Sequence, residues 1–180
     1  MNFLYGLIVL PESLSKENRR NFDIKTAIPG RSLIKLKRYP IIIGLVISIF
    51  FLYLAGKSVE TTWTFYTMLK FKWSEAWVGY SLGFVGILVS IVEGGLIRVI
   101  VLKIGNKKAI YFGFVLNIIG LIGFAFSSQS WMMFAFLLPY CLGGIGGPAL
   151  QGIISNQVPA NEQGELQGAL TGLMSLAAIL

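Results

Sequence analysis

Residues 41–56 read IIIGLVISIFFLYLAG, and none of these sixteen side chains carries a charge. A helix needs about 20 predominantly apolar residues to cross roughly 30 Å of membrane hydrocarbon. The apolar pattern continues amphipathically to about Leu69, which supplies the missing length. We therefore expect a transmembrane helix that starts after Pro40 and ends near Leu69.

The composition of the whole chain agrees with this stretch. Of 180 residues, 55% are hydrophobic and 13% are charged, and the mean hydropathy is +0.73. Soluble domains carry about 25% charged residues, so a single water-soluble domain and intrinsic disorder are both excluded. The absence of histidine and the single cysteine, Cys141, exclude a disulfide framework, ordinary zinc sites and histidine-based catalysis. We expect no metal, no cofactor and no enzymatic activity.

More apolar segments follow the first one, separated by short polar connections. The expected membrane helices cover 77–102, 109–127 and 131–156, and another starts near Gln163 and is still apolar at Leu180. These lengths predict an all-α membrane protein.

The N-terminal part of the chain has a different character. Residues 1–10 (MNFLYGLIVL) are apolar but too short to span a bilayer, and Pro11 ends them. We interpret them as the second half of a membrane helix. Residues 11–40 form a polar, basic loop, long enough to link two halves of a larger protein. Because the chain starts and stops within apolar segments, we expect a fragment of a larger polytopic protein.

The positive charges indicate an orientation in the membrane. Eight of the fifteen basic residues fall between Lys16 and Arg38. Such a block beside hydrophobic segments marks a cytoplasmic loop rather than a nucleic-acid arm, because cytoplasmic loops are enriched in Lys and Arg. With 11–40 in the cytoplasm, the basic turn at 103–108 lies on the same side and the uncharged turn at 127–130 lies outside.

Polar side chains near the end of the first helix are candidates for a solute site. Lys57 and Glu60 are three residues apart and so share one helix face, and Trp63 and Tyr66 follow. An ion pair at membrane depth normally faces a protein interior or a water-filled cavity. Alternatively, the helix tilts and these residues form its interfacial end.

Three further polar residues lie inside later segments. Glu93 is nearly three turns from the cytoplasmic end of its helix, so we interpret it as a gating or proton-carrying carboxyl, or as a charge that reaches the interface or a neighbouring helix. Asn117 either hydrogen-bonds a neighbouring helix or contacts solute. Gln151 adds a polar group near the cytoplasmic end of its segment.

Glycine and proline interrupt the last two segments. The fourth helix contains LLPYCLGGIGGPALQG, in which Pro139, Gly143, Gly147 and Pro148 permit bending and close helix approach. The fifth has a glycine every four residues, at Gly164, Gly168 and Gly172. Helices interrupted in this way are typical of transporters that bend during alternating access.

Four stretches together resemble one family. They are VLPESLSKENRR (9–20), WTFYTMLKFKWSEAWVGYSLG (63–83), LKIGNKKA (102–109) and GGIGGPALQGIISNQVPANEQGELQGAL (143–170). They resemble the tetracycline-resistance branch of the major facilitator superfamily over essentially all 180 residues. One position departs from that branch, because its tetracycline exporters have an acidic residue where Asn117 aligns.

This resemblance implies a partial C-terminal six-helix half of the superfamily fold. Residues 1–10 would be the end of helix 6, 11–40 the central cytoplasmic loop, and 41–180 helices 7–10 with part of helix 11. It implies proton-driven export of a drug-like small molecule from a bacterial inner membrane. The expected partners are lipid, protons, the solute and the N-terminal half of the transporter, and not nucleic acid.

Two other interpretations stay open. The chain alone has no opposing half to rock against, so we expect it to be inactive in transport by itself. It is then either half of a transporter or a non-transporting membrane scaffold, such as the inert product of a truncated gene. A self-assembling half-transporter would need a pairing that the sequence does not reveal.

Overall fold

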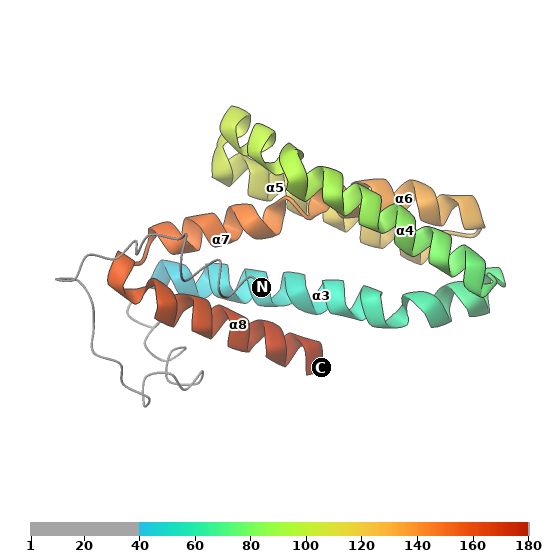
Figure 1. The fold of residues 1–180 in the computed structure, drawn as a ribbon, viewed down its shortest axis with the longest axis horizontal. Helices are drawn as coiled ribbons and strands as arrows, with labels where there is room; N and C mark the ends of the chain where they lie inside the picture. Colours follow the sequence, from blue (N-terminus) through green and yellow to red (C-terminus); the bar gives the residue numbers. More distant parts are fainter. Residues whose placement is uncertain (1–39, 180) are drawn as a thin grey trace, which may run out of the picture.

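The computed structural model describes residues 40–179, which form helices joined by short turns, with no strand among them (Figure 1). The elements in order are α3 (Pro40–Phe71), α4 (Glu75–Ile91), the π-helical turn η3 (Val92–Leu96), α5 (Ile97–Phe126), α6 (Ser130–Gly143), α7 (Gly146–Asn156), the 3₁₀ turn η4 (Ala160–Glu162) and α8 (Gln163–Ile179). The all-α prediction is confirmed for this part of the chain. The predictions for 1–10 and for 11–39 lie outside the described residues.

Three stretches within 40–179 are long and apolar enough to cross a membrane: Ile42–Phe71, Glu75–Phe126 and Ser130–Asn156. The middle one has 52 residues, far more than the roughly 20 that one crossing needs. It contains Gly105, whose backbone is not helical (φ 79°, ψ 159°). The chain reverses there, at the upper left of Figure 1, so this stretch supplies two crossings and agrees with the segments expected at 77–102 and 109–127.

The second part of α5 packs antiparallel against α6 and the start of α7. A Cβ built on Gly120 would meet the backbone of Tyr140, and one on Gly113 would meet the backbone of Gly146. Such close approach needs residues without side chains, as is common between membrane helices. The segment expected at 131–156 is divided by a short turn at Gly144 and Ile145, where the sequence pattern predicted a bend.

Two apolar clusters hold the helices together at opposite ends of α3. The first joins α3 to α7 and α8 through Ile42, Val46, Ile49, Leu150, Ile154, Val158, Leu166, Ala169 and Leu170. The second joins the far end of α3 to α4, α5 and α6 through Trp63, Trp73, Val78, Phe124, Met133 and Leu137. Because the clusters occupy the two ends, they leave the middle of α3 for the cavity described below.

Two of the four tryptophans of the chain are buried. Trp63 and Trp73 are each 6% exposed and belong to the second cluster, with ring centroids 6.4 Å apart. Trp77 and Trp131 remain exposed. The hydropathy pattern of the sequence contains no information on which helix face each ring occupies.

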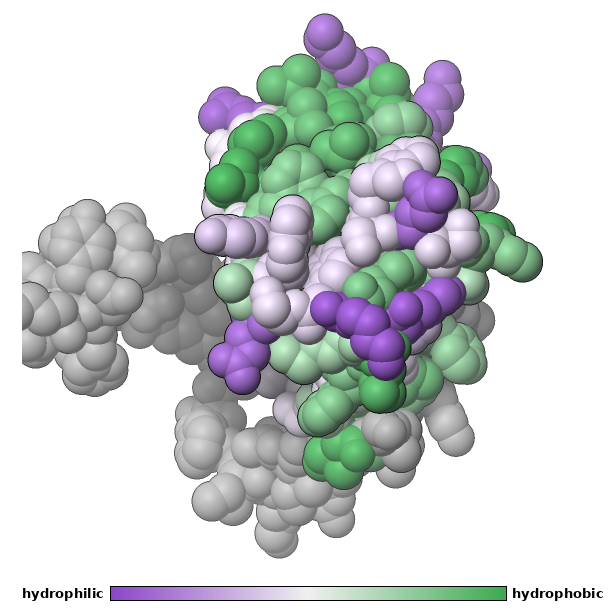
Figure 2. All heavy atoms as spheres, turned by 90° about the vertical axis from the view of Figure 1, so that its right-hand side faces the viewer, coloured by the Kyte–Doolittle hydropathy of each residue, from purple (hydrophilic) through white to green (hydrophobic). Residues whose placement is uncertain are grey.

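The surface of the bundle changes character between its ends and its flanks. Figure 2 looks onto the end where the α3–α4 and α5–α6 turns lie, and hydrophilic residues gather there while hydrophobic residues border them. Large apolar side chains on the flanks, among them Phe51, Phe65, Ile87 and Phe126, are exposed. Extended exposed apolar surface of this kind is expected where lipid surrounds a protein.

Candidate functional site

A cavity of about 520 Å³ lies beside the middle of α3. This volume is in the range of sites for drug-sized molecules. Its walls come from α3, α4, η3, α5, α6 and α7. The lining residues are Leu52, Tyr53, Gly56, Lys57, Val59, Glu60, Trp63, Leu82, Val85, Val89, Glu93, Asn117, Leu137, Tyr140, Cys141, Gly144, Gly147 and Pro148.

Five of the seven residues that the sequence singled out line this cavity. Lys57, Glu60 and Trp63 come from α3, Glu93 from η3 and Asn117 from α5. The three on α3 are spaced three residues apart and therefore share one helix face. The remaining two residues arrive from elements distant in sequence, so the fold assembles polar groups from three walls around one space.

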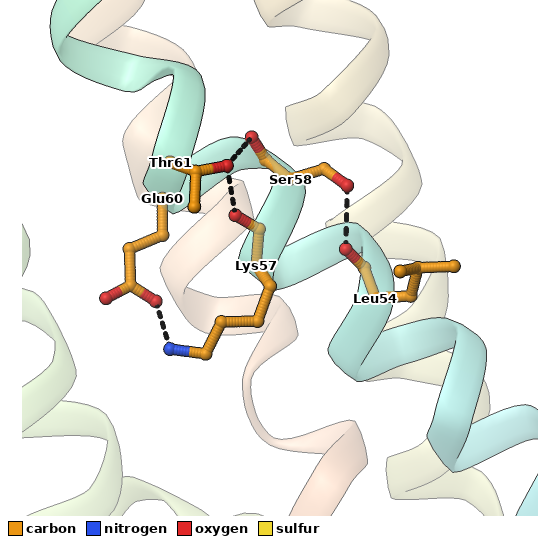
Figure 3. Close-up of polar contacts among 5 residues, drawn as sticks. All are labelled: Leu54, Lys57, Ser58, Glu60 and Thr61. Atoms are coloured by element: carbon orange, nitrogen blue, oxygen red, sulfur yellow. Dashed lines mark hydrogen bonds and ion pairs between the residues drawn. The ribbon is translucent and has the colours of Figure 1, made fainter. Parts of the chain in front are cut away.

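Lys57 and Glu60 form an ion pair across one turn of α3 (Figure 3). The distance from Lys57 Nζ to Glu60 Oε2 is 2.6 Å, and the two side chains are 43% and 68% exposed. The neighbouring hydroxyls are not free donors, because Ser58 donates to the carbonyl of Leu54 and Thr61 to that of Lys57. The ion pair is therefore the main polar feature of this wall.

Glu93 lies on the π-helical turn that separates α4 from α5. A π-turn inserts an extra residue into a helix and is frequent at functional sites. Among residues 40–179, no hydrogen bond or salt bridge engages the Glu93 carboxylate, and no pair with Arg98 forms. The charge of Glu93 acts on the phenol of Tyr53, which lines the same cavity from α3. Glu93 thus places on the cavity wall a carboxyl that has no hydrogen-bond or ion-pair partner within residues 40–179.

Two tyrosines and the cysteine of this cavity were not predicted. Tyr53 precedes Lys57 by one helical turn, a spacing that could have pointed to the same face. Tyr140 lies near the charge of Glu60, and its hydroxyl faces Gly56 of α3. Cys141 lines the same space and is 5% exposed. No sequence signal placed the α6 residues, because their position depends on how α6 packs.

Tyr66 and Gln151 lie elsewhere. Tyr66 lines a smaller cavity of about 210 Å³ together with Trp63 and Phe124. Its hydroxyl donates to the carbonyl of Phe124 at 3.0 Å and accepts from Lys70 Nζ at 2.7 Å. Gln151 lines neither cavity, and its amide nitrogen donates to Gln167 of α8 at 3.0 Å. Both residues tie helices together in the described structure.

The glycines and prolines that the sequence singled out have different surroundings in the structure. A Cβ on Gly143 would lie 2.7 Å from the backbone nitrogen of Asn117, so this glycine permits the close crossing of α5 and α6. Gly147 and Pro148 line the main cavity, and Pro139 lies inside α6 but not on the cavity wall. Apart from the chain neighbours and backbone of its own helix, no described atom comes within 4 Å of a Cβ on Gly164 or Gly168, so their packing role stays a prediction.

Comparisons with known proteins connect this chain to a family of membrane transporters. The sequence pattern of the Major Facilitator Superfamily matches residues 1–180. The class C tetracycline resistance protein of Escherichia coli is 32% identical over 179 residues, which are 99% of this chain and 45% of that protein. The class E protein of Escherichia coli is 38% identical over 137 residues (76% and 34%). The Hippocampus abundant transcript 1 protein of Homo sapiens is 28% identical over 181 residues (98% and 37%).

The chain therefore spans less than half the length of the curated relatives it matches. No solved structure matches it significantly.

Proposed function

The chain belongs to the major facilitator superfamily, and from this premise we propose that it serves in proton-coupled export of a drug-like solute across a membrane. Its resemblance to tetracycline resistance proteins connects it to antibiotic efflux. The chain is a multi-pass membrane protein by its apolar helices and its family. The coupling ion, the solute and the cellular membrane are parts of the proposal.

The observation that carries the proposal is a cavity with ionisable walls in the middle of the helices. On α3 the lining residues run from Leu52 to Trp63. They follow the first apolar cluster, whose last residue on α3 is Ile49, and they reach the second cluster at Trp63. A helix that spans the bilayer has this stretch near the membrane midplane, which is where secondary transporters bind solutes. Ionisable groups at that depth are costly and are normally retained for function.

Each group has a proposed role. Glu93, with no partner among the described residues, is the proton-carrying carboxyl. Lys57 and Glu60 orient polar parts of the solute, while Trp63 and Asn117 contact its body. The turn at Gly144 and Ile145, next to the cavity, is the place where the α6–α7 segment bends during alternating access.

The orientation follows from the basic residues. We propose that 11–40 and the turn containing Lys103, Lys107 and Lys108 face the cytoplasm of a bacterium, with the inner membrane as the location. In family terms, 1–10 ends helix 6, and 41–180 supplies helices 7–10 with part of helix 11. The other half of the cavity wall would come from an N-terminal half.

Everted membrane vesicles from cells that co-express residues 1–180 with the first half of the class C tetracycline resistance protein provide the test. Addition of tetracycline to energised vesicles should release protons from the lumen and accumulate the drug, and Glu93→Gln should reduce both by at least tenfold. Glu75→Gln, which changes an exposed glutamate outside the cavity, is the matched control. If a panel of drug-like solutes causes no proton movement, the alternative of a non-transporting scaffold replaces the proposal.

A further inference from the structure

We infer that the smaller cavity, between α3, α5 and α6, holds one acyl chain of an anionic phospholipid whose phosphate binds Lys70. This inference goes beyond the proposed function, because it concerns a different cavity and holds whether or not the chain exports a solute. It is carried by the chemistry of the cavity wall, by its depth along α3 and by the position of Lys70.

The wall of the smaller cavity offers apolar surface and no free polar donor. The three polar side chains on it already donate hydrogen bonds: Thr62 to the carbonyl of Ser58 at 2.6 Å, and Trp63 and Tyr66 to groups on α4 and α5. A hydrocarbon chain needs no hydrogen bonds, whereas a polar solute would lose those it makes with water. The volume of about 210 Å³ is below that of drug-sized sites and suits a slender chain. The lining residues are Val59, Thr62, Trp63, Tyr66, Leu121, Phe124, Ala125 and Met133.

The cavity is accessible from the apolar flank of the helices. Thr62 and Ala125 line it and are exposed. Phe65 on α3 and Phe126 on α5 are neighbours of lining residues in the sequence, and they are 72% and 80% exposed. Apolar surface of this extent is expected to face lipid, so acyl chains have direct access to the cavity.

The depth of the cavity matches one leaflet of a bilayer. Lys70 lies in the last turn of α3, and exposed Trp77 and Trp131 at the same end are typical of the headgroup region. A helix rises about 1.5 Å per residue, so Val59 lies about 16 Å from Lys70 along α3. One leaflet contributes about 15 Å of hydrocarbon. An acyl chain whose headgroup lies at Lys70 therefore extends along the whole α3 wall of the cavity.

Lys70 places a positive charge at the headgroup end of this cavity. Its ammonium donates to the hydroxyl of Tyr66 at 2.7 Å and lies 5.0 Å from the centroid of the Tyr66 ring and 5.5 Å from that of Phe71. Because Tyr66 lines the cavity, these contacts hold the charge at its edge. Within residues 40–179 no carboxylate pairs with Lys70. An ammonium has more donors than the single hydroxyl uses, so the others are available to phosphate oxygens.

Photo-crosslinking in nanodiscs tests the site with the full chain. Purified residues 1–180 are placed in phosphatidylcholine that contains a small fraction of phosphatidylglycerol with a diazirine in one acyl chain. After illumination, mass spectrometry should locate cross-links at 59–66 and 121–125. Phosphatidylcholine with the same diazirine should label these residues about fivefold less, the factor expected for one lysine beside an anionic headgroup.

Two lysine variants test the headgroup contact. Lys70→Gln should remove the preference for phosphatidylglycerol at these residues. Lys72→Gln is the matched control, because Lys72 is also exposed at this end of the helices but makes no hydrogen bond or ring contact within residues 40–179. It should leave the preference unchanged. Equal losses in the two variants would show diffuse attraction by the surface and would overturn the site.

A third variant tests the cavity itself. Ala125→Leu adds a larger exposed side chain to the wall and should lower cross-linking at 59–66 at least threefold. Ala76→Leu, at an exposed position of α4 outside the cavity, should not lower it. Millimolar inorganic phosphate should not compete, since the acyl chain contributes to binding. Competition by phosphate, equal labelling by the two lipids, or no cross-links at 59–66 and 121–125 would overturn the inference, even if everted vesicles export a solute.

Discussion

The indole nitrogen of Trp63 donates a hydrogen bond of 2.9 Å to the hydroxyl of Ser81, and the bond is buried between α3 and α4. The Ser81 hydroxyl in turn donates a hydrogen bond to the carbonyl of Val78 at 2.7 Å. Trp63 lines both cavities, so this bond fixes the ring that stands between them. The ring also contacts Phe124 of α5, with centroids 5.2 Å apart. One side chain therefore connects the main cavity to the packing of three helices.

Ser81→Ala should leave the Trp63 N–H without its acceptor. We expect a loss of about 0.6–2 kcal/mol in unfolding free energy, the range for interhelical hydrogen bonds in membranes. The measurement is reversible unfolding in detergent. Ser90→Ala is the control, because the Ser90 hydroxyl bonds its own helix at Gly86 and is exposed. Equal effects of the two variants would contradict this role for Ser81.

Gly105 sets the reversal of the chain between α4 and the second part of α5. Its backbone angles, φ 79° and ψ 159°, fall in a region that is essentially restricted to glycine. Gly105→Ala should destabilise the fold by about 1–3 kcal/mol, seen as a lower melting temperature in detergent. Gly164→Ala, which adds a Cβ into open space within a helix, should not lower it. If Gly105→Ala melts like the parent, the reversal does not depend on this residue.

Gly143 and Asn117 mark one close contact between α5 and α6. A methyl group on Gly143 would lie 2.7 Å from the Asn117 backbone nitrogen and 2.8 Å from its Cα, so the helices would have to separate. We expect Gly143→Ala to cost about 1–3 kcal/mol, the usual cost of overpacking. Gly168→Ala meets no described atom and is the matched control. Thermal unfolding of both variants checks this, and similar melting temperatures would show that the crossing is looser.

The membrane-spanning helices could be predicted from the sequence because hydropathy is a local property. The long apolar run before Lys57 and the polar turns near Lys72 and Ser128 marked the ends of spans without tertiary information. The sequence did not predict the π-turn around Glu93, since a single extra residue in a helix leaves no trace in hydropathy.

The candidate site was only partly accessible from sequence for a different reason. Lys57, Glu60 and Trp63 share a helix face by spacing, so one wall could be predicted. Tyr140 and Cys141 reach the cavity through the crossing of α5 and α6, which depends on small residues in both helices. Gln151 was selected for polarity, but its partner Gln167 lies on another helix and could not be inferred from spacing.

Residues 1–180 alone should not couple a solute to protons. The cavity has a wall from the described helices, but Glu93, Leu82 and Glu60 are exposed, so the solute space is not closed on all sides. Alternating access requires a second bundle to close against the first. Proteoliposomes with residues 1–180 should show no solute-dependent proton flux. Co-reconstitution with the first half of the class C relative should raise the flux above that background, and flux from residues 1–180 alone would contradict this expectation.

Membrane sidedness is the most direct test of the account, because every argument about the cavity assumes that α5 crosses the bilayer between the turns at 103–108 and 127–130. In a Cys141→Ser background, Lys107→Cys and Ser128→Cys each give one exposed thiol at opposite ends of the bundle. Treatment of intact cells with an impermeant maleimide should label Ser128→Cys, whereas Lys107→Cys should be labelled only after permeabilisation. Labelling of both positions from the same side would contradict the account.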